Sequence, residues 1–394
     1  MPSWRSASQI FPGSHVCRRY YNLMKITAIH WHTYRLPFLH NFHTAHGVLD
    51  AREGLIVQVT TSDGVTGVGE IAPLPTFRGG SLTDACALLP ELDGRLYHRT
   101  LYEALELLST VKVSAKNAST LCGLEIAIFD ALGKTMGCNV STLLSSSAFT
   151  PLTAVPVNAV ISTKATMAAA ETALHAKKNG FSCVKLKVGL GLGISEEVER
   201  IASVRDAIGP TLHLRLDANE AWQLDEAIAI LSQCVPYNIQ YIEQPTKVQD
   251  LVGMQALRQE IPIPIAADES VHDLESVYLM LDNKAADILV IKPQLAGGLR
   301  IAQQMIQAAS ERGVGCVITS TLEAGIGLAA ELHLAAASPL VTLECGLATF
   351  PLLVDDLLVE DLHFRDGFLA VPTGPGLGVE LDQQALERYI GNSE

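Results

Sequence analysis

The sequence predicts an α/β protein built from a (β/α)8 TIM-type barrel and an α+β capping domain. Eight short apolar runs alternate with amphipathic helical segments between residues 155 and 345. Each repeat has about the length of one strand with its return helix, and the first 150 residues read as strands followed by helices. Eight sequential βα units favour a closed barrel, and a doubly wound open sheet is the alternative.

This pattern divides the 394 residues into four segments. Residues 1–23 are basic and lack periodicity, so we expect a disordered tail. Residues 24–150 form the expected capping domain and residues 151–349 the expected barrel. Residues 350–394 resume a strand-and-turn pattern, which we expect to return to the capping domain.

In the expected capping domain, residues 24–72 alternate apolar and polar side chains, with Ser62, Asp63 and Gly64 at the turn of a hairpin. Residues 81–148 change to helical spacing. The barrel strands are expected in the runs "VPVNAVI" (155–161), "CVKLKV" (183–188), "LHLRLD" (212–217), "IQYIE" (239–243), "IPIAAD" (263–268), "ADILVIK" (286–292), "GCVITS" (315–320) and "VTLEC" (341–345).

Composition argues against several classes of partner. The net charge of −14 disfavours nucleic acid and anionic membrane surfaces, and no apolar run reaches the roughly 18 residues that cross a bilayer. The eight cysteines are scattered singly, as is typical of free thiols in a reducing compartment. We therefore expect a cytoplasmic protein, with plastid targeting through residues 1–23 as the alternative. A homo-oligomer is compatible with this composition.

Charged residues mark the ends of five successive predicted strands. These residues are Lys187, Asp217, Glu243, Asp268 and Lys292. The last four are separated by 26, 25 and 24 residues, which is one βα unit each. Because the C-terminal ends of barrel strands meet at one mouth, we expect the three carboxylates to converge there between lysines.

The three carboxylates of Asp217, Glu243 and Asp268 predict a metal site. Converging carboxylates remain ionised together only when a cation lies among them. Oxygen ligands suit a hard dication, so we expect Mg²⁺, with Mn²⁺ as a substitute.

Three lysines are the candidate acid–base groups. Lys185 and Lys187 are two residues apart on one strand and share a face, and Lys292 lies four strands away across the mouth. We expect the ammonium of Lys185 and the dication to disfavour the charged form of Lys187, which makes Lys187 a better base. This set is typical of removing a proton from the carbon beside a substrate carboxylate, with the enediolate stabilised by the metal. The expected partner is therefore a small carboxylate substrate.

Five further residues are candidates to surround the metal ligands or to bind substrate. They are Asn219, Glu269, Ser320, Glu323 and Gly346, at or just after the predicted strand ends. A single polar residue after a strand is more often a loop residue or a helix cap. The charged residues are informative because they recur in register on five successive units.

Five motifs contain these residues: "KLKVG" (185–189), "LDANEAW" (216–222), "YIEQP" (241–245), "IAADES" (265–270) and "IKPQLAGGL" (291–299). Together they resemble the enolase superfamily, muconate-lactonizing subgroup, over the chain from about Met24 to near the C-terminus. The resemblance implies that Asp217, Glu243 and Asp268 hold Mg²⁺ and that Lys187 and Lys292 are facing acid–base lysines. It also implies that loops of the capping domain close over the mouth and select the substrate.

Within this subgroup, the region "ECGLATFPLLVDDLL" (344–358) lacks the Asp-x-Asp with which dipeptide epimerases grip a substrate ammonium. "CGLATF" is similar to the o-succinylbenzoate synthases, the menaquinone-pathway dehydratases, as are "GEIAPLPTF" (69–77) and "VPVNAVI". This resemblance implies syn-dehydration of 2-succinyl-6-hydroxy-2,4-cyclohexadiene-1-carboxylate. Lys187 would carry the proton, and Lys292 would act through its charge.

Other reactions on the same scaffold stay open. Dipeptide epimerases, N-acylamino acid racemases and muconate-type cycloisomerases share the constellation, and a fold does not fix a reaction. Glu220 stands where many members have Gly, next to the metal site. A non-catalytic binding or structural protein is the remote alternative, and the complete set of lysines and carboxylates argues against it.

Overall fold

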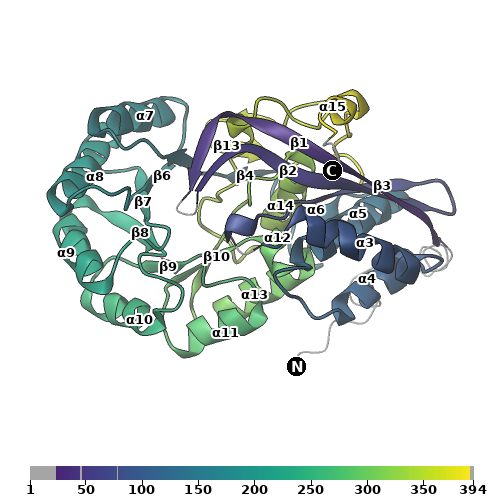
Figure 1. Ribbon diagram of the computed structural model, residues 1–394, viewed down its shortest axis with the longest axis horizontal. Helices are drawn as coiled ribbons and strands as arrows, with labels where there is room; N and C mark the ends of the chain where they lie inside the picture. Colours follow the sequence, from purple (N-terminus) through teal and green to yellow (C-terminus); the bar gives the residue numbers. More distant parts are fainter. Residues whose placement is uncertain (1–23, 45–46, 78, 391–394) are drawn as a thin grey trace.

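The computed structural model describes residues 24–44, 47–77 and 79–390, so the tail expected at residues 1–23 lies outside the described residues. A parallel barrel sheet and a separate antiparallel sheet dominate the fold (Figure 1). Within the described part of the chain, no helix is both long and apolar enough to cross a membrane.

Seven parallel strands form the barrel sheet and are neighbours in chain order. They are β5 (Ala159–Ile161), β6 (Cys183–Lys187), β7 (His213–Asp217), β8 (Ile239–Glu243), β9 (Ile265–Ala267), β10 (Ile288–Ile291) and β11 (Gly315–Ile318). The helices that follow them are α7 (Thr166–Lys178), α8 (Ile194–Ile208), α9 (Leu224–Cys234), α10 (Leu251–Glu260), α11 (Leu274–Asp282), α12 (Pro293–Ala296), α13 (Leu299–Glu311) and α14 (Gly325–Ala336). The long helices α7 to α11 lie in sequence around the outside of the strands (Figure 1), which confirms the predicted TIM-type architecture.

The eighth barrel position is filled without a full strand. Residues 341–345 were expected to form one, but Cys345 and Gly346 make only single parallel bridges, to Val157 and Thr319. These two bridges join the segment to both edges of the seven-stranded sheet. The prediction of a regular eighth strand is therefore wrong, although the position is occupied.

A buried arginine explains how so short a segment is held. Arg215 on β7 is fully buried and donates to the backbone oxygen of Glu344 (2.6 Å) and to its carboxylate (2.9 Å). Its Nε also donates to Gln240 (2.6 Å), and its guanidinium lies 4.8 Å from the ring centroid of Tyr241. Side-chain hydrogen bonds inside the barrel thus replace part of the backbone hydrogen bonds of a regular strand. The buried charge of Arg215 is tolerated because the carboxylate of Glu344 neutralises it.

The first predicted strand, residues 155–161, is split. Its first half belongs to β4 (Ala154–Pro156), which pairs with β13 (Phe368–Ala370) and through it with β12 (Phe364–Arg365). Only β5 enters the barrel. The split follows from the hydrogen bonds of the intervening Val157, whose backbone N–H donates outside the barrel sheet.

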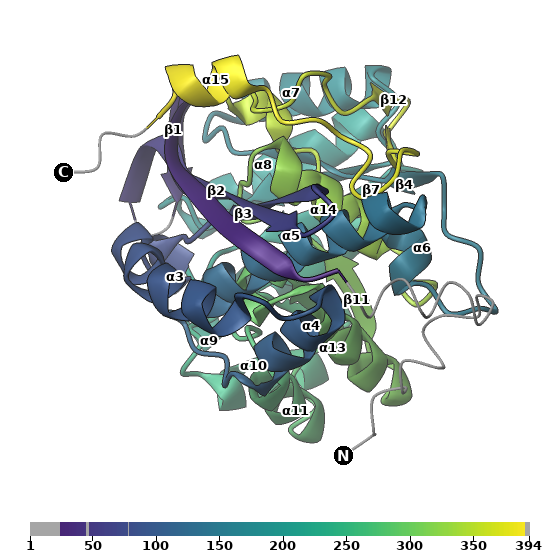
Figure 2. The same cartoon turned by 90° about the vertical axis from the view of Figure 1, so that its right-hand side faces the viewer.

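The capping domain is an antiparallel sheet packed on a buried helix (Figure 2). Its strands are β1 (Ile26–Thr44), β2 (Gly47–Thr61) and β3 (Thr66–Ile71), and its helices are α3 (Leu82–Leu96), α4 (Leu101–Thr110), α5 (Ala118–Met136) and α6 (Val140–Leu144). The predicted hairpin joins β2 to β3. Gly67 and Gly69 allow α5 to lie against β3, because a Cβ at either would collide with the backbone oxygen of Ala127 or Gly123.

The C-terminal segment contacts both halves of the molecule. Leu353 and Ile390 form isolated bridges with Phe38 and Tyr34 on β1, and the short helix α15 (Gln383–Arg388) lies just before the second bridge. β13 instead pairs with β4 beside the barrel. The domain boundaries expected from the sequence remain a prediction.

Two buried carboxylates of the capping domain cap barrel helices. Glu125 on α5 accepts from the backbone N–H of Leu299 (2.5 Å) and from the guanidinium of Arg300 (2.5 Å) at the start of α13. Glu70 on β3 accepts from two backbone N–H groups at the start of α14, at 2.8 Å each. The first N–H groups of a helix lack intrahelical partners and carry partial positive charge. These contacts therefore give hydrogen-bond partners both to the buried carboxylates and to the helix N–H groups. They also fix the two domains against each other.

His333 on α14 joins three segments. The imidazole is fully buried; its Nδ1 accepts from the backbone N–H of Ser141 (3.2 Å) and its Nε2 donates to the backbone oxygen of Leu377 (2.9 Å). Both bonds require a neutral ring with the proton on Nε2. Burial lowers the pKa of His333 from 6.5 to about 4.

This lowered pKa predicts a loss of stability in acid. Below pH 6.5 the His333 imidazole is protonated in the unfolded chain, but in the folded protein it stays neutral down to about pH 4. The free energy of unfolding therefore falls as the pH is lowered through this window. The contribution is up to roughly 3 kcal/mol. Urea unfolding should show that the free energy of unfolding drops more between pH 7.5 and pH 5 in the wild type than in His333→Gln. Equal losses in the two proteins would contradict this role.

Candidate active site

The C-terminal ends of β6 to β10 bring the predicted charged residues to one mouth. Lys187, Asp217 and Glu243 end three adjacent strands and are paired in register across them. Asp268 directly follows β9, and Lys292 directly follows β10. The chain therefore presents one charged side chain from each of five neighbouring strands.

The first two lysines share the carboxylate of Asp217, and Lys185 also contacts Glu243. Lys185 Nζ lies 3.0 Å from Glu243 Oε1 and 3.2 Å from Asp217 Oδ2, and Lys187 Nζ lies 2.7 Å from the same Asp217 oxygen. All four side chains are largely enclosed, and both carboxylates are fully buried. The repulsion expected between the two ammonium groups is thus offset by the carboxylates between them.

The pKa shifts follow from this charge pattern. Burial disfavours the Lys185 ammonium, but the charges of Glu243 and Asp217 outweigh burial and raise its pKa well above the usual value. Burial also opposes ionisation of Asp217, yet Lys187 and Lys185 lower its pKa. Burial and the neighbouring charge of Asp217 raise the pKa of Glu243 to about 7. The two carboxylates therefore favour the charged form of Lys185.

Lys292 lies across the mouth with its own partners. Its Nζ donates to Asp268 Oδ2 (2.6 Å) and sits 4.7 Å from the centroid of the Phe77 ring. Burial lowers the pKa of Lys292, but Asp268 and Glu269 outweigh this and raise it above the usual value. Phe77 comes from the capping domain and was not predicted as a site residue. In the sequence, Phe77 ends the motif "GEIAPLPTF".

The three carboxylates meet two of the requirements of a metal site. Their oxygens are the ligands that Mg²⁺ prefers, and Asp268 Oδ1 is buried without a hydrogen-bond partner. In residues 24–44, 47–77 and 79–390, however, no three His, Cys, Asp or Glu side chains are arranged as a formed metal cage. The carboxylates face lysines instead. Metal binding by Asp217, Glu243 and Asp268 therefore requires them to turn from these partners and remains a proposal.

Asn219 and Glu269 extend the network around Lys187. Lys187 donates to Asn219 Oδ1 (2.6 Å), and Asn219 Nδ2 donates to Glu269 Oε1 (2.9 Å). The second oxygen of Glu269 is buried without a hydrogen-bond partner, and burial and the charge of Asp268 raise its pKa to about 8. The amide orientation of Asn219 is thus fixed from both sides.

Ser320 and Gly346 lie beside each other where β11 meets the closing segment. The backbone N–H of Ser320 donates to the Gly346 oxygen (3.2 Å), and its hydroxyl lies 2.8 Å from that of Thr349. Both residues thus lie where the closing segment borders the C-terminal end of a barrel strand. Their expected roles toward substrate remain predictions.

The Glu323 side chain lies at the interface with the capping domain. Its carboxylate accepts from the backbone N–H (2.7 Å) and the hydroxyl (2.5 Å) of Thr321. Its charged neighbours are Arg52, Glu70 and Glu331, at the interface with the capping domain. The structure therefore groups Glu323 with the domain interface rather than with the lysines, and its role in substrate binding stays a prediction.

The backbone just beyond the strands is strained. Asn219, Glu220, Gln244 and Leu322 have φ values of 42°, 65°, 37° and 67°, in a region that favours glycine. Three of these residues follow β7 and β8 directly, beside the charged network. The positive φ of Glu220 is physically consistent with glycine at this position in many family members.

Two of these strained residues brace neighbouring strand ends. The Glu220 carboxylate accepts from the backbone N–H of Val248 (2.7 Å), joining the loops after β7 and β8. Gln244 Oε1 accepts from the backbone N–H groups of Asp268 (3.1 Å) and Ser270 (3.2 Å). The main chain of a proposed metal ligand is thus fixed by a side chain from the preceding strand.

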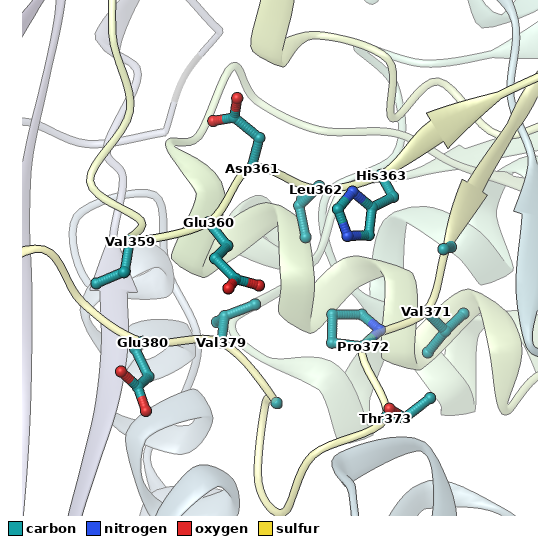
Figure 3. Close-up of a pocket in the computed structure, with 12 residues that line it drawn as sticks. Val359, Glu360, Asp361, Leu362, His363, Val371, Pro372, Thr373, Val379 and Glu380 are labelled. Atoms are coloured by element: carbon teal, nitrogen blue, oxygen red, sulfur yellow. The ribbon is translucent and has the colours of Figure 1, made fainter.

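A cavity of about 450 Å³ lies apart from this network, in the C-terminal segment (Figure 3). It is lined by Val359, Glu360, Asp361, Leu362, His363, Ala370, Val371, Pro372, Thr373, Gly378, Val379 and Glu380. No residue of the strand-end network borders it. The site chemistry described above therefore belongs to the barrel mouth alone.

Comparison with known proteins agrees with this architecture. Residues 167–385 match the model of the enolase C-terminal domain-like family, and residues 26–145 match the mandelate racemase / muconate lactonizing enzyme N-terminal domain. The chain belongs to the enolase superfamily, in its muconate-lactonizing subgroup.

Three relatives illustrate the range of reactions in the family. Muconate cycloisomerase 1 of Rhodococcus opacus is 30% identical over 365 residues, covering 90% of this chain and 94% of the relative. The o-succinylbenzoate synthase of Thermobifida fusca is 36% identical over 218 residues, covering 55% and 66%. A substrate-liganded structure of the L-Ala-D/L-Glu epimerase from Bacillus subtilis superimposes with a TM-score of 0.83 at 27% identity, covering 90% and 98%.

Removal of divalent metal should abolish activity, and Mg²⁺ or Mn²⁺ should restore it. The reason is that the buried carboxylates need another cation to stay ionised when the lysines act on the substrate instead of pairing with them. Calorimetric titration of the metal-free protein with Mn²⁺ should show one site, which is lost in Asp268→Asn and kept in Asp361→Asn, an exposed carboxylate. Full activity of a protein shown by elemental analysis to be metal-free would contradict the assignment.

Lys187→Ala should lower kcat by about 10²- to 10⁴-fold, the usual worth of a general base, and leave the fold intact. Lys185→Ala should lower kcat less but cost about 3 kcal/mol of unfolding free energy, because it removes the counter-charge of buried Glu243 and leaves Asp217 with Lys187 alone. Kinetics and urea unfolding of both variants test this contrast. A Lys187→Ala protein with more than a tenth of wild-type kcat would show that another group is the base.

Proposed function

We propose that the protein is an o-succinylbenzoate synthase, which dehydrates 2-succinyl-6-hydroxy-2,4-cyclohexadiene-1-carboxylate in menaquinone biosynthesis. The observation that carries this proposal is the absence of an acidic residue from positions 345–349 of the closing segment. Residues 345–349 are Cys-Gly-Leu-Ala-Thr and contain no acid. A substrate ammonium would find no partner there, and an unpaired buried charge is costly.

The nearby carboxylates are occupied elsewhere. Glu344 is bound by Arg215 (2.9 Å), His213 (2.8 Å) and Ser182 (3.1 Å). Asp356 accepts from the backbone N–H of Gly325 (2.7 Å) at the start of α14. These bonds support a substrate that carries carboxylates and no amine.

The reaction needs one proton carrier on one face of the substrate ring. Lys187, as the free amine, would take the α-proton, and the C–H electron pair would become an enediolate. Lys187 would then return that proton to the departing hydroxyl on the same face as the C–O bond breaks. The products are water and an aromatic ring, so atoms and charges balance without any redox partner.

Lys292 would act through its charge in this scheme. Its ammonium would stabilise the negative charge that develops on the substrate. A Mg²⁺ ion bound by Asp217, Glu243 and Asp268 would supply further positive charge beside the substrate carboxylate. Asn219 would orient Lys187 through the bond that Glu269 supports.

The 36% identity to the Thermobifida fusca o-succinylbenzoate synthase supports the proposal over part of the chain. The second candidate is a racemase or epimerase. It is favoured by the two lysines on opposite sides of the mouth, which is the arrangement for moving a proton from one face to the other. The epimerase and the cycloisomerase among the relatives match the chain over most of its length.

The substrate test measures dehydration and proton exchange on the same protein. The purified enzyme should convert the cyclohexadiene to o-succinylbenzoate, followed by ultraviolet loss of the diene. Exchange of the α-proton of an Ala-Glu dipeptide or an N-succinylamino acid in deuterated water should be slow or absent. Lys292→Arg, which keeps the charge but gives up its proton far less readily, should retain part of the dehydration and no racemisation.

Two outcomes would overturn the proposal. Efficient epimerisation without dehydration would assign the racemase function instead. Loss of all dehydration in Lys292→Arg, with retained substrate binding, would mean that Lys292 transfers a proton rather than acting through its charge.

A further inference from the structure

The ammonium of Lys292 is held between the two domains. On the barrel side it donates to Asp268 Oδ2 (2.6 Å), and on the other side it lies 4.7 Å from the centroid of the Phe77 ring. Phe77 ends the short 3-10 helix η1 (Pro75–Phe77) that follows β3 of the capping domain. An ammonium within about 6 Å of a ring centroid is attracted by the π electrons of the ring.

The capping domain is anchored at this same point of the barrel. Gln294, two residues beyond Lys292, donates to the backbone oxygen of Glu70 (2.9 Å) and accepts from the backbone N–H of Ala72 (3.1 Å). Gln294 is buried, so these bonds are not exchanged with solvent. They fix the segment that carries Lys292 against the strand that leads to Phe77.

The loop also lies close to the next barrel residues. A Cβ added at Gly79 would come within 2.7 Å of Leu295 Cδ2, so the backbone at Gly79 is already packed against the helix that follows Lys292. The contact between Phe77 and Lys292 is thus flanked on both sides by tight packing between the domains.

We propose that Phe77 is a positioning residue that holds the Lys292 ammonium in place and shields it from water. Asp268 alone would attract the ammonium but would leave its other side to solvent. The ring covers that side, so the ammonium is held in position between the ring and Asp268. This inference rests on the proposed function, in which Lys292 acts through its charge.

A competing role for Phe77 is that of a passive apolar wall for substrate. The two roles differ in what an aliphatic side chain can replace. Leucine supplies an apolar wall of similar size but has no π face, whereas tyrosine keeps the ring. A wall affects KM for the substrate, while a group that holds the ammonium affects kcat.

The kinetic experiment compares Phe77→Leu, Phe77→Tyr and a matched control, Phe368→Leu, which makes the same change at an exposed position on β13. Phe77→Leu should lower kcat of dehydration about 10-fold, which corresponds to roughly 1.4 kcal/mol, with a smaller change in KM. Phe77→Tyr should stay within about threefold of wild type, and Phe368→Leu should be unchanged. Wild-type kcat in Phe77→Leu, an equal loss in Phe77→Tyr, or a change in KM alone would overturn the proposal.

A second measurement needs no substrate. Lysine side chains of the intact protein are labelled by reductive methylation and quantified peptide by peptide by mass spectrometry. Lys292 should be protected in the wild type and in Phe77→Tyr and labelled faster in Phe77→Leu, while exposed Lys178 reacts equally in all three. Equal labelling of Lys292 throughout would overturn the inference. If the labelling differs as expected but the wild type does not dehydrate, the proposed function fails and the contact stands.

Discussion

Lysines are paired with buried carboxylates at the ends of β6 to β10. This pairing constrains how the strands of the barrel can be aligned with one another. Removing a charge from water costs several kcal/mol unless a partner of opposite sign is in contact with it. Here each of the three carboxylates, those of Asp217, Glu243 and Asp268, is in contact with at least one lysine ammonium group. The strands must hold their register for these contacts to exist, because a shift by one residue would turn each charge to the opposite face.

The remainder of the fold holds these strand ends still. Arg215 ties the closing segment to the barrel interior, and Gln244 fixes the backbone of Asp268 from the neighbouring strand. Glu70 and Glu125 of the capping domain occupy the N-termini of α14 and α13, the helices that follow the last two barrel strands. Positive φ values at Asn219, Glu220 and Gln244 place strain close to the charged residues. Such strain persists only where the surrounding structure over-determines it.

The same framework can serve several reactions because it supplies charge and a base but little selectivity. Relatives named as a muconate cycloisomerase, an L-Ala-D/L-Glu epimerase and an o-succinylbenzoate synthase match this chain in sequence. Differences between such reactions depend on a few groups around the mouth. In this protein they include the acid-free segment 345–349 and the aromatic ring that the capping domain places over Lys292. These groups are therefore the candidates for setting substrate specificity in this protein.

The barrel repeat, the hairpin at Gly64 and the five charged residues at successive strand ends could all be predicted from the amino-acid sequence. These features depend on the spacing of apolar residues along one segment, which is local information. Three other features depend on tertiary contacts. Cys345 and Gly346 close the barrel without a strand. Glu323 faces the domain interface, and Phe77 covers Lys292. Each of these outcomes depends on which distant group meets a given side chain. Arg215 and Glu344, for example, are 129 residues apart, and no local periodicity specifies which buried charge will neutralise another across such a separation.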